Sequence, residues 1–297
     1  MTLKSVLFAA ATSLPVAVTF AEPATTTLPP IDVWAHVFDG QPLQEEAPTG
    51  AYGQPDWLSN RRFATTRAYI QQDPWEVGVE QWWRSRDDGG HWSHLFQEEV
   101  EIGLPGRFQF DLYYDWSVEN HNAEYQDTAV ELRWALADWD KIFLNPTIYL
   151  EYKFVDPKQG GDIFEPKLLL SEEFGHGWHW AMNFIWEKEL TGKENEEWAV
   201  TQAISKTIID SKLSIGVEMN YKWETTNGHR DNPESQFNIG PSIQWRPTPD
   251  SHIDVVALPG LTEDGPDFEG WLVMGFDFGA GTSKTKDHSF APVSSRQ

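Results

Sequence analysis

Residues Lys212 to Glu224 read KLSIGVEMNYKWE, and their side chains alternate between apolar and polar. The apolar face of an extended chain here would carry Leu213, Ile215, Val217, Met219, Tyr221 and Trp223, and the opposite face Ser214, Gly216, Glu218, Asn220, Lys222 and Glu224. A helix with 3.6 residues per turn would scatter both sets, whereas a strand with a period of two separates them. The stretch therefore predicts a β-strand with one apolar face and one polar face.

Two further stretches, 107–118 and 178–186, repeat this alternation, with Ile185 as an apolar exception on the polar face of the second. Weaker copies occupy 75–85, 92–103, 127–137, 143–155, 162–174, 196–206, 235–246, 251–259 and 270–279. Strands of about 9–11 residues can cross a bilayer, and bacterial outer-membrane barrels have an even number of strands. About twelve such strands predict an all-β fold, namely an antiparallel up-and-down transmembrane β-barrel.

The connections and the tryptophans support the same fold. Tight turns are expected at 104–106, 138–141, 175–177, 209–211 and 247–250, and longer polar loops at 87–90, 119–124, 156–161, 191–196, 225–234 and 262–267. Short periplasmic turns alternate with longer external loops in outer-membrane barrels, and many tryptophans here fall at expected strand ends, as in aromatic girdles. We therefore expect both termini of the barrel to be periplasmic.

The flanking segments have a different organisation. Lys4, an apolar run and small residues up to Ala21 are typical of a secretory signal peptide over residues 1–21. Residues 22–74 are interrupted by proline and glycine and are expected to lie in the periplasm or to plug the barrel, with 57–72 as a short helix or an extended strap. The barrel would span 75–279, and residues 280–297 would form a polar C-terminal tail.

Composition excludes several classes of function. The chain has 46 acidic and 22 basic residues, a formal charge of -24 and no cysteine. This balance excludes a disulfide scaffold, a cysteine-based metal site and a basic surface for nucleic acid. The acidic loops at 87–88 and 263–267 lack the spacing of a calcium-binding EF-hand loop, so neither a metal nor a cofactor is expected. The expected partners are outer-membrane lipid and small-molecule solutes, and the oligomeric state stays open.

The polar face of the strands would line the lumen. The lining residues expected from the alternation are Glu99, Glu101, Asp111, Asp115, Glu131, Arg133, Glu151, Lys153, Glu218 and Lys222. Carboxylates outnumber cations in this set, so an open pore would favour cations or neutral solutes. The same residues could instead close the lumen by cross-strand ion pairs, and a barrel of about twelve strands lies between the packed and the open sizes.

A soluble secreted β protein that binds or cleaves polysaccharide is the competing hypothesis. Tryptophans would stack on sugars, and Glu99 and Glu101 would share a strand face. Two carboxylates about 7 Å apart on one face suit acid–base hydrolysis. No nucleophile elbow, Walker loop, dinucleotide-binding glycine motif or HExxH zinc motif is present in the sequence, so we expect no enzymatic activity.

Three short stretches resemble a known family. They are LNPTIYLEY at 144–152, EPKLLL at 165–170, and Gly260-Leu261-Thr262 with Pro266-Asp267 before the final aromatic strand. They are similar to outer-membrane barrels described as transporters of the meta-pathway of phenol degradation, over about residues 75–279. The resemblance implies a barrel that passes small molecules, with aromatic compounds as candidates, and it carries no functional residues over. We therefore expect an outer-membrane protein that acts as a passive channel or uptake protein.

Overall fold

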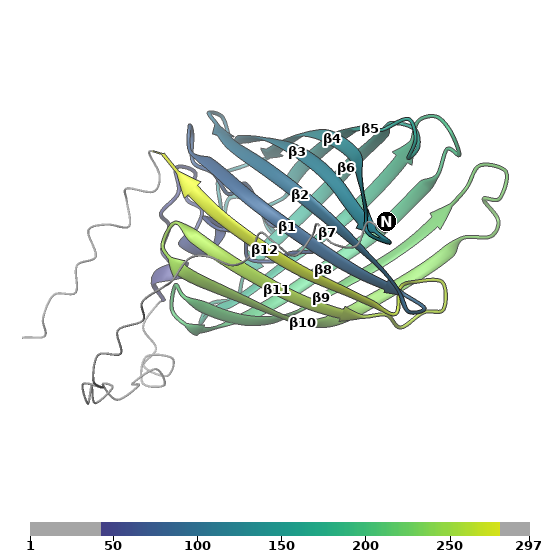
Figure 1. Cartoon of the computed structure of the whole chain (residues 1–297). Coiled ribbons are helices and arrows are strands. Elements are labelled where there is room, and N and C mark those ends of the chain that lie inside the picture. The colour runs from purple at the N-terminus through teal and green to yellow at the C-terminus, as the bar shows by residue number, and fades with distance from the viewer. Residues whose placement is uncertain (1–42, 280–297) are drawn as a thin grey trace, which may run out of the picture.

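The computed structural model describes residues 43–279, and within them twelve antiparallel strands form one closed barrel (Figure 1). The strands are β1 (Val77–Asp88), β2 (His91–Leu104), β3 (Phe108–Glu119), β4 (Asn122–Ala135), β5 (Thr147–Val155), β6 (Ile163–Glu173), β7 (Trp178–Glu189), β8 (Glu196–Ile209), β9 (Leu213–Thr225), β10 (Glu234–Thr248), β11 (Ser251–Pro259) and β12 (Phe268–Phe278). Two 3₁₀ turns, η1 (Gln44–Glu46) and η2 (Asp56–Leu58), precede them. The predicted fold class is confirmed, whereas the expected signal peptide and polar tail lie outside the described residues.

The barrel closes between its first and last strands. β1 pairs with β12 in an unbroken antiparallel register from Val77 opposite Phe278 to Asp87 opposite Phe268. Every other strand pairs with its two neighbours in the sequence. Closure leaves no strand edge whose backbone N–H and C=O groups would lack partners in hydrocarbon.

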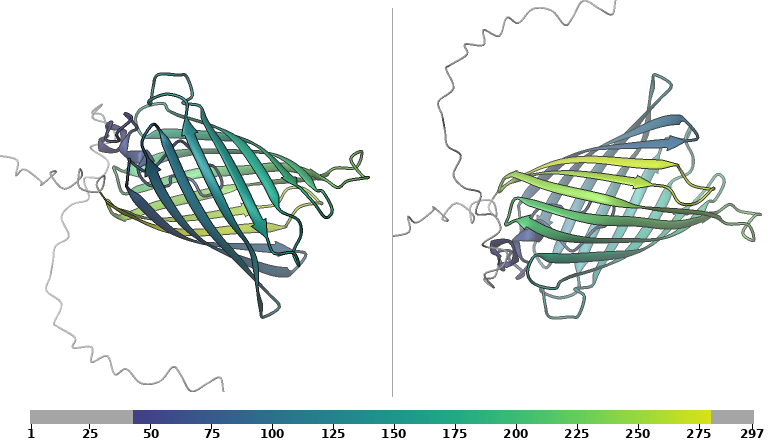
Figure 2. Two further views of the ribbon diagram at one scale, coloured as in Figure 1. Left: turned by 90° about the horizontal axis from the view of Figure 1, so that it is seen from above. Right: turned by 90° about the horizontal axis from the view of Figure 1, so that it is seen from below.

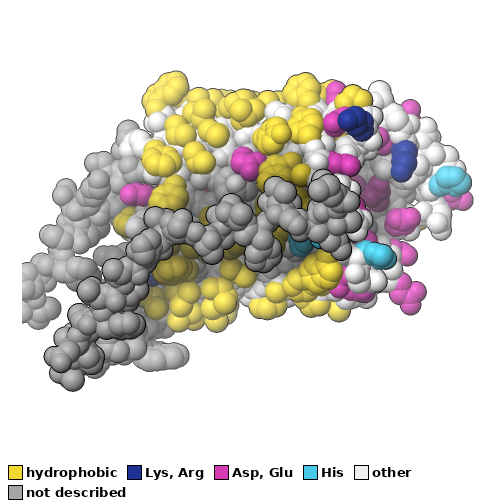
Figure 3. All heavy atoms as spheres, viewed as in Figure 1, with side chains coloured by type: hydrophobic (Ala, Val, Ile, Leu, Met, Phe, Trp, Pro, Cys, Tyr) yellow, Lys and Arg dark blue, Asp and Glu magenta, His cyan; other side chains and the backbone are white. Residues whose placement is uncertain are grey.

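The apolar side chains of the strands point outward from the barrel. On β9, Ile215 and Val217 are 47% and 45% exposed, whereas Ser214 and Glu218 are buried inside the barrel. Apolar side chains cover much of the outer surface in Figure 3, and charged ones gather at the end that carries the longer loops. A soluble protein would bury the apolar face, so the arrangement supports a barrel in lipid and argues against the soluble alternative.

No helix among residues 43–279 is long and apolar enough to cross a bilayer.

The connections at the two ends of the barrel differ in length. Four short turns, 105–107, 174–177, 210–212 and 249–250, lie at the end where β1 begins, together with the longer connection 136–146. Four longer loops, 156–162, 190–195, 226–233 and 260–267, lie at the other end, together with the two-residue turns 89–90 and 120–121. In Figure 2 the 3₁₀ turns, in purple, lie at the first of these ends. In the usual orientation of outer-membrane barrels, the end with the short turns is periplasmic.

Three of the expected connections were wrong in length. The polar stretches 87–90 and 119–124 are not loops, because β1–β2 and β3–β4 join through the two-residue turns Gly89-Gly90 and Asn120-His121. All four turn residues have positive φ, between 48° and 88°, which suits the tight hairpin turns that continue the strand twist. Conversely, 138–141 does form a tight turn, in which the Lys141 N–H donates to the Asp138 carbonyl at 3.2 Å, but it lies within the longer connection 136–146 and does not join two strands directly.

The interior of the barrel contains a separate segment of the chain. Residues 56–73, which we call the strap, begin with η2 and then follow an irregular, extended path, so 57–72 is not a helix beyond that first turn. Most strap side chains are buried, among them Trp57, Phe63 and Ile70. The strap enters from the end where β1 begins, since Gln44 and Glu45 donate backbone hydrogen bonds to Asp210 in the β8–β9 turn.

Candidate functional site: the lumen and its internal strap

An apolar cluster anchors the strap at the end of the barrel where it enters. The strap contributes Trp57, Leu58, Phe63, Tyr69 and Ile70, and the wall contributes Ala135, Ala181, Ala203 and Trp139. Trp139 belongs to the long connection 136–146 and makes edge-to-face contacts with Trp57 and Tyr69. The three wall alanines are small, so the large strap side chains fill space that bulky wall residues would otherwise occupy.

Polar wall side chains satisfy the irregular backbone of the strap. Thr65 donates its backbone N–H to Glu218 at 2.8 Å. Asn183 accepts from the backbone N–H of Arg67 at 2.8 Å and donates to its carbonyl at 2.7 Å. The side-chain oxygen of Gln109 accepts from the backbone of Gln71 at 2.8 Å. Because a buried backbone group without a partner is costly, these contacts hold the strap in one position.

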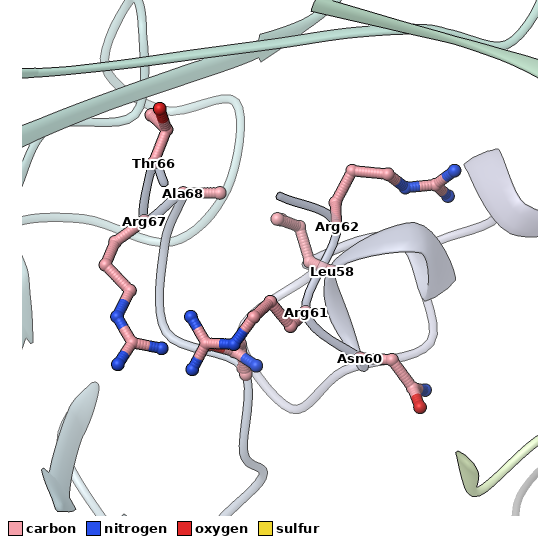
Figure 4. A pocket seen from close by; sticks show the side chains of 8 residues that line it. Leu58, Asn60, Arg61, Arg62, Thr66, Arg67 and Ala68 are labelled. Atoms are coloured by element: carbon pink, nitrogen blue, oxygen red, sulfur yellow. The ribbon is translucent and has the colours of Figure 1, made fainter. Parts of the chain in front are cut away.

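Two strap arginines bind the acidic wall. Arg61 donates from Nε to Glu80 at 2.7 Å and from Nη2 to Glu101 at 3.3 Å. Arg67 donates from Nη2 to Glu99 at 3.0 Å and to the Tyr113 hydroxyl at 2.9 Å. Figure 4 shows these two guanidinium groups on the same side of the strap, with that of Arg62 pointing elsewhere. The strap therefore brings positive charge to the part of the lumen where the wall is most acidic.

Arg67 stays charged in its buried position on the strap. Burial alone would lower the pKa of Arg67, but its acidic neighbours, Glu99 first among them, hold that pKa well above its usual range. Tyr69, also on the strap, stays a neutral donor because burial, aided by the charge of Asp138, raises the pKa of its hydroxyl. That hydroxyl donates to the Ala137 carbonyl at 2.6 Å.

A wall arginine completes the network. Arg133 on β4 donates from Nη2 to Asp111 at 2.6 Å, and its Nε donates to Glu131. Its Nη1 donates to the Gln71 side chain of the strap at 3.0 Å. Tyr113 also donates its hydroxyl to Glu131. Three arginines from two parts of the chain thus compensate the central carboxylates.

All ten residues predicted to line the lumen have strand positions that face the interior. Eight are buried, namely Glu99, Glu101, Asp111, Asp115, Glu131, Arg133, Glu151 and Glu218, and Lys153 and Lys222 are half-buried. The arginine network brings together five of them, namely Glu99, Glu101, Asp111, Glu131 and Arg133. The others lie apart from it and have other partners: Glu218 binds Thr65, Asp115 accepts from Gln97 at 3.2 Å, and Lys222 pairs with Glu197 at 3.1 Å. Whether solutes pass along these residues stays a prediction.

A second charged cluster lies nearer the end of the barrel with the longer loops. Lys153 is 3.0 Å from Glu165, 2.8 Å from Glu187 and 3.7 Å from Glu151. Lys153 and Glu187 keep about a fifth to a quarter of their side-chain surface exposed, at 21% and 26%. Cross-strand ion pairs therefore occupy one part of the lumen, and the strap occupies another.

The sequence did not identify the strap arginines or Trp82 as site residues. One signal for the arginines was available in the sequence. All the Lys and Arg residues of stretch 22–74 are arginines close together, at 61, 62 and 67, and the wall expected from the alternation is acidic. Trp82 occupies an inward position on β1 and is 5% exposed. Its donor N–H binds Glu80 at 3.0 Å and Glu99 at 2.9 Å.

Carboxylates in this network are close enough together to hold a metal ion. Ligand oxygens of Glu80, Glu99 and Glu101 lie within 4.8 Å of one another, and so do those of Glu99, Asp111 and Glu131. Arginine guanidinium groups already contact both sets. A small pocket beside them is lined by strap residues Leu58, Asn60, Arg61, Arg62, Thr66, Arg67, Ala68 and Gln71.

The fold and the outward apolar face define the class: the protein is an outer-membrane β-barrel. The model of the family described as "Putative MetA-pathway of phenol degradation" matches residues 144–274, which confirms the resemblance noted in the sequence over that part of the chain.

Solved structures share this fold at low sequence identity. An outer membrane channel from Pseudomonas putida F1 aligns with 13% identity and a TM-score of 0.53, over 73% of this chain and 100% of that chain. The NanC porin aligns with 14% identity and a TM-score of 0.48, over 69% of this chain and 100% of that chain. A comparison with curated proteins gives no match.

Proposed function

We propose that the protein is a passive outer-membrane channel for small solutes, that the strap is its plug, and that the conformation described above is the closed one. One observation carries this proposal: a separate segment fills much of the interior. Small barrels of about eight strands are filled by their own wall side chains. Here alanines such as Ala181 and Ala203, and glycines such as Gly103, leave space that the strap occupies. Withdrawal of the strap would leave this part of the lumen lined by polar wall side chains.

We further propose that the lumen takes cations and neutral solutes in preference to anions. Once the strap is absent, Glu80, Glu99, Glu101, Asp111 and Glu131 are compensated within the wall network mainly by Arg133. An excess of fixed negative charge in a narrow pore attracts cations and repels anions.

The carboxylates support an electrostatic role rather than catalysis. Glu99 and Glu101 share a strand face, as the polysaccharide hypothesis required, but both accept hydrogen bonds from Arg61. A general acid must reach its substrate, and here the oxygens of both carboxylates are occupied by donors from the strap, namely Arg61 and Arg67 on Glu99 and Arg61 and Gln72 on Glu101. We therefore propose transport without chemistry.

Conductance in planar lipid bilayers tests the channel. We expect the full chain to be closed for most of the time, and its Arg61→Ala/Arg67→Ala variant to conduct for longer, because the strap has lost its ion pairs. Lys222→Ala is the matched control, since Lys222 pairs with Glu197 of the wall. Reversal potentials under a salt gradient should show cation preference. A folded double variant that conducts no ions would instead indicate a closed structural barrel.

A further inference from the structure

We propose that the wall around Trp82 is a binding site for solutes that carry a guanidinium or similar flat organic cation, and that Arg61 and Arg67 of the strap occupy it in the closed state. The proposal rests on the proposed channel function, for which it names the class of solute. Arg61 and Arg67 of the strap would then mimic the bound solute.

Arg61 fills the first position of the site. The central carbon of its guanidinium lies over the Trp82 ring, 4.3 Å from the ring centre. Its N–H groups bind Glu80 at 2.7 Å, Glu99 at 3.3 Å and Glu101 at 3.3 Å. An aromatic face with carboxylates at the edge matches the shape and the donors of a planar guanidinium.

Arg67 fills a second position beside the first. Its guanidinium centre lies 5.3 Å from the Trp82 ring, and it donates to Glu99 and to the Tyr113 hydroxyl. Two guanidinium groups thus share one indole and one carboxylate. A solute with one cationic group would need one of these positions, and a longer solute with two cationic groups could fill both.

The site is held in shape by the wall as well as by the strap. The Trp82 N–H contacts both Glu80 and Glu99, and this fixes the indole relative to the acids. His252 on β11 lies 3.2 Å from the second oxygen of Glu80, and Arg133 lies 3.7 Å from Glu101. Because these wall groups stay when the strap leaves, the acids and the ring keep their arrangement for an incoming cation.

The chemistry of the site favours an organic cation over a metal ion. Calcium and magnesium select oxygen ligands on several sides, whereas one side of this site is an indole face. A guanidinium is weakly hydrated and stacks on aromatic rings. A solute of this class would compete directly with Arg61 and Arg67, so its binding would favour withdrawal of the strap.

Chemical rescue tests the proposal on the full chain. In the Arg61→Ala/Arg67→Ala variant the site is vacated, and we add methylguanidinium, or urea as an uncharged molecule of similar shape, at equal millimolar concentration and constant ionic strength. Methylguanidinium should raise the temperature at which the unboiled, faster-migrating band is lost in a gel, and should interrupt the channel current in a concentration-dependent way. Urea should do neither. Adding Trp82→Leu should weaken the effect about tenfold, since a desolvated cation–π contact is of that order.

Two further variants keep the result interpretable. Arg62→Ala/Arg246→Ala removes two other buried guanidinium groups, which pair with Glu45 and Asp56 outside the Trp82 site, and should show no rescue. If the alanine variant does not fold, Arg61→Gln/Arg67→Gln retains hydrogen-bonding groups and takes its place. Equal effects of urea and methylguanidinium, or no shift with either, would overturn the site. A variant that shows the thermal shift but never conducts would keep the binding site and contradict the channel function.

Discussion

The hydroxyl of Thr65 donates a hydrogen bond to Glu218 Oε2 at 2.7 Å, which joins the strap to the wall strand β9. The backbone N–H of the same threonine binds the same carboxylate oxygen. This pair is 153 residues apart in the chain, so it reports whether the strap is inside the barrel.

The first prediction uses this contact to lock the strap. The chain has no cysteine, so Thr65→Cys/Glu218→Cys introduces a unique pair. Joining the two thiols with a short reducible cross-linker about as long as a glutamate side chain should lower the open probability in planar bilayers, and a reductant should restore it. Each single cysteine variant, treated in the same way, is the control. Identical currents before and after reduction would show that the strap does not gate the lumen.

A second prediction concerns Gly103, where the strap backbone packs directly against the wall. A Cβ atom added there would lie 2.0 Å from the Asp73 carbonyl oxygen, so Gly103→Ala must displace the end of the strap. Overpacking of this kind costs about 1–3 kcal/mol, which we expect to favour the open state by about tenfold in single-channel recordings. Val100→Ala, on the outward face of the same strand, should leave the open probability unchanged. A less stable barrel that stays closed would indicate that the strap is a permanent part of the fold.

The barrel could be predicted from the sequence because each strand carries its own evidence. Alternation over 212–224 needs no knowledge of any other part of the chain, and the pattern of neighbouring strands and the turns between them then set the register. The short hairpins at 89–90 and 120–121 were missed because acidic residues beside them were interpreted as loops. In the structure these acidic residues are the ends of the strands and lead directly into the tight turns. The strands are therefore longer than the minimum length that crosses a bilayer.

The strap could not be predicted in the same way. Its apolar residues follow no period, and its partners lie far away in the sequence, as for Arg67 and Asn183, which are 116 residues apart. The inward positions of Glu99 and Glu101 followed from alternation, but their pairing with Arg61 did not. Only charge complementarity between a basic cluster and an acidic wall linked the two regions.

The third prediction separates the stability of the wall from gating. Arg133 is fully buried between Asp111 and Glu131, so Arg133→Met leaves carboxylates without their partner. Breaking a buried ion pair in this way costs about 3–5 kcal/mol, and the variant should lose its faster-migrating band at a clearly lower temperature. Arg107→Ala breaks an exposed pair with Asp138 and should change this temperature little, since such pairs contribute about 0–1 kcal/mol. Similar temperatures for the two variants would contradict the stabilising role of Arg133.

The fourth prediction tests the lipid-facing surface on which the membrane assignment depends. Val217 points outward from β9, so Val217→Arg places a charge in hydrocarbon at a cost of about 2–4 kcal/mol near the bilayer midplane. Asn220 lies on the inward face of the same strand, where Asn220→Arg meets polar side chains instead. We expect Val217→Arg alone to reduce the fraction that folds into liposomes, measured by the faster-migrating band. Equal folding of the two variants would mean that the outward face of β9 does not contact lipid, because only a lipid environment distinguishes a charge on one face from a charge on the other.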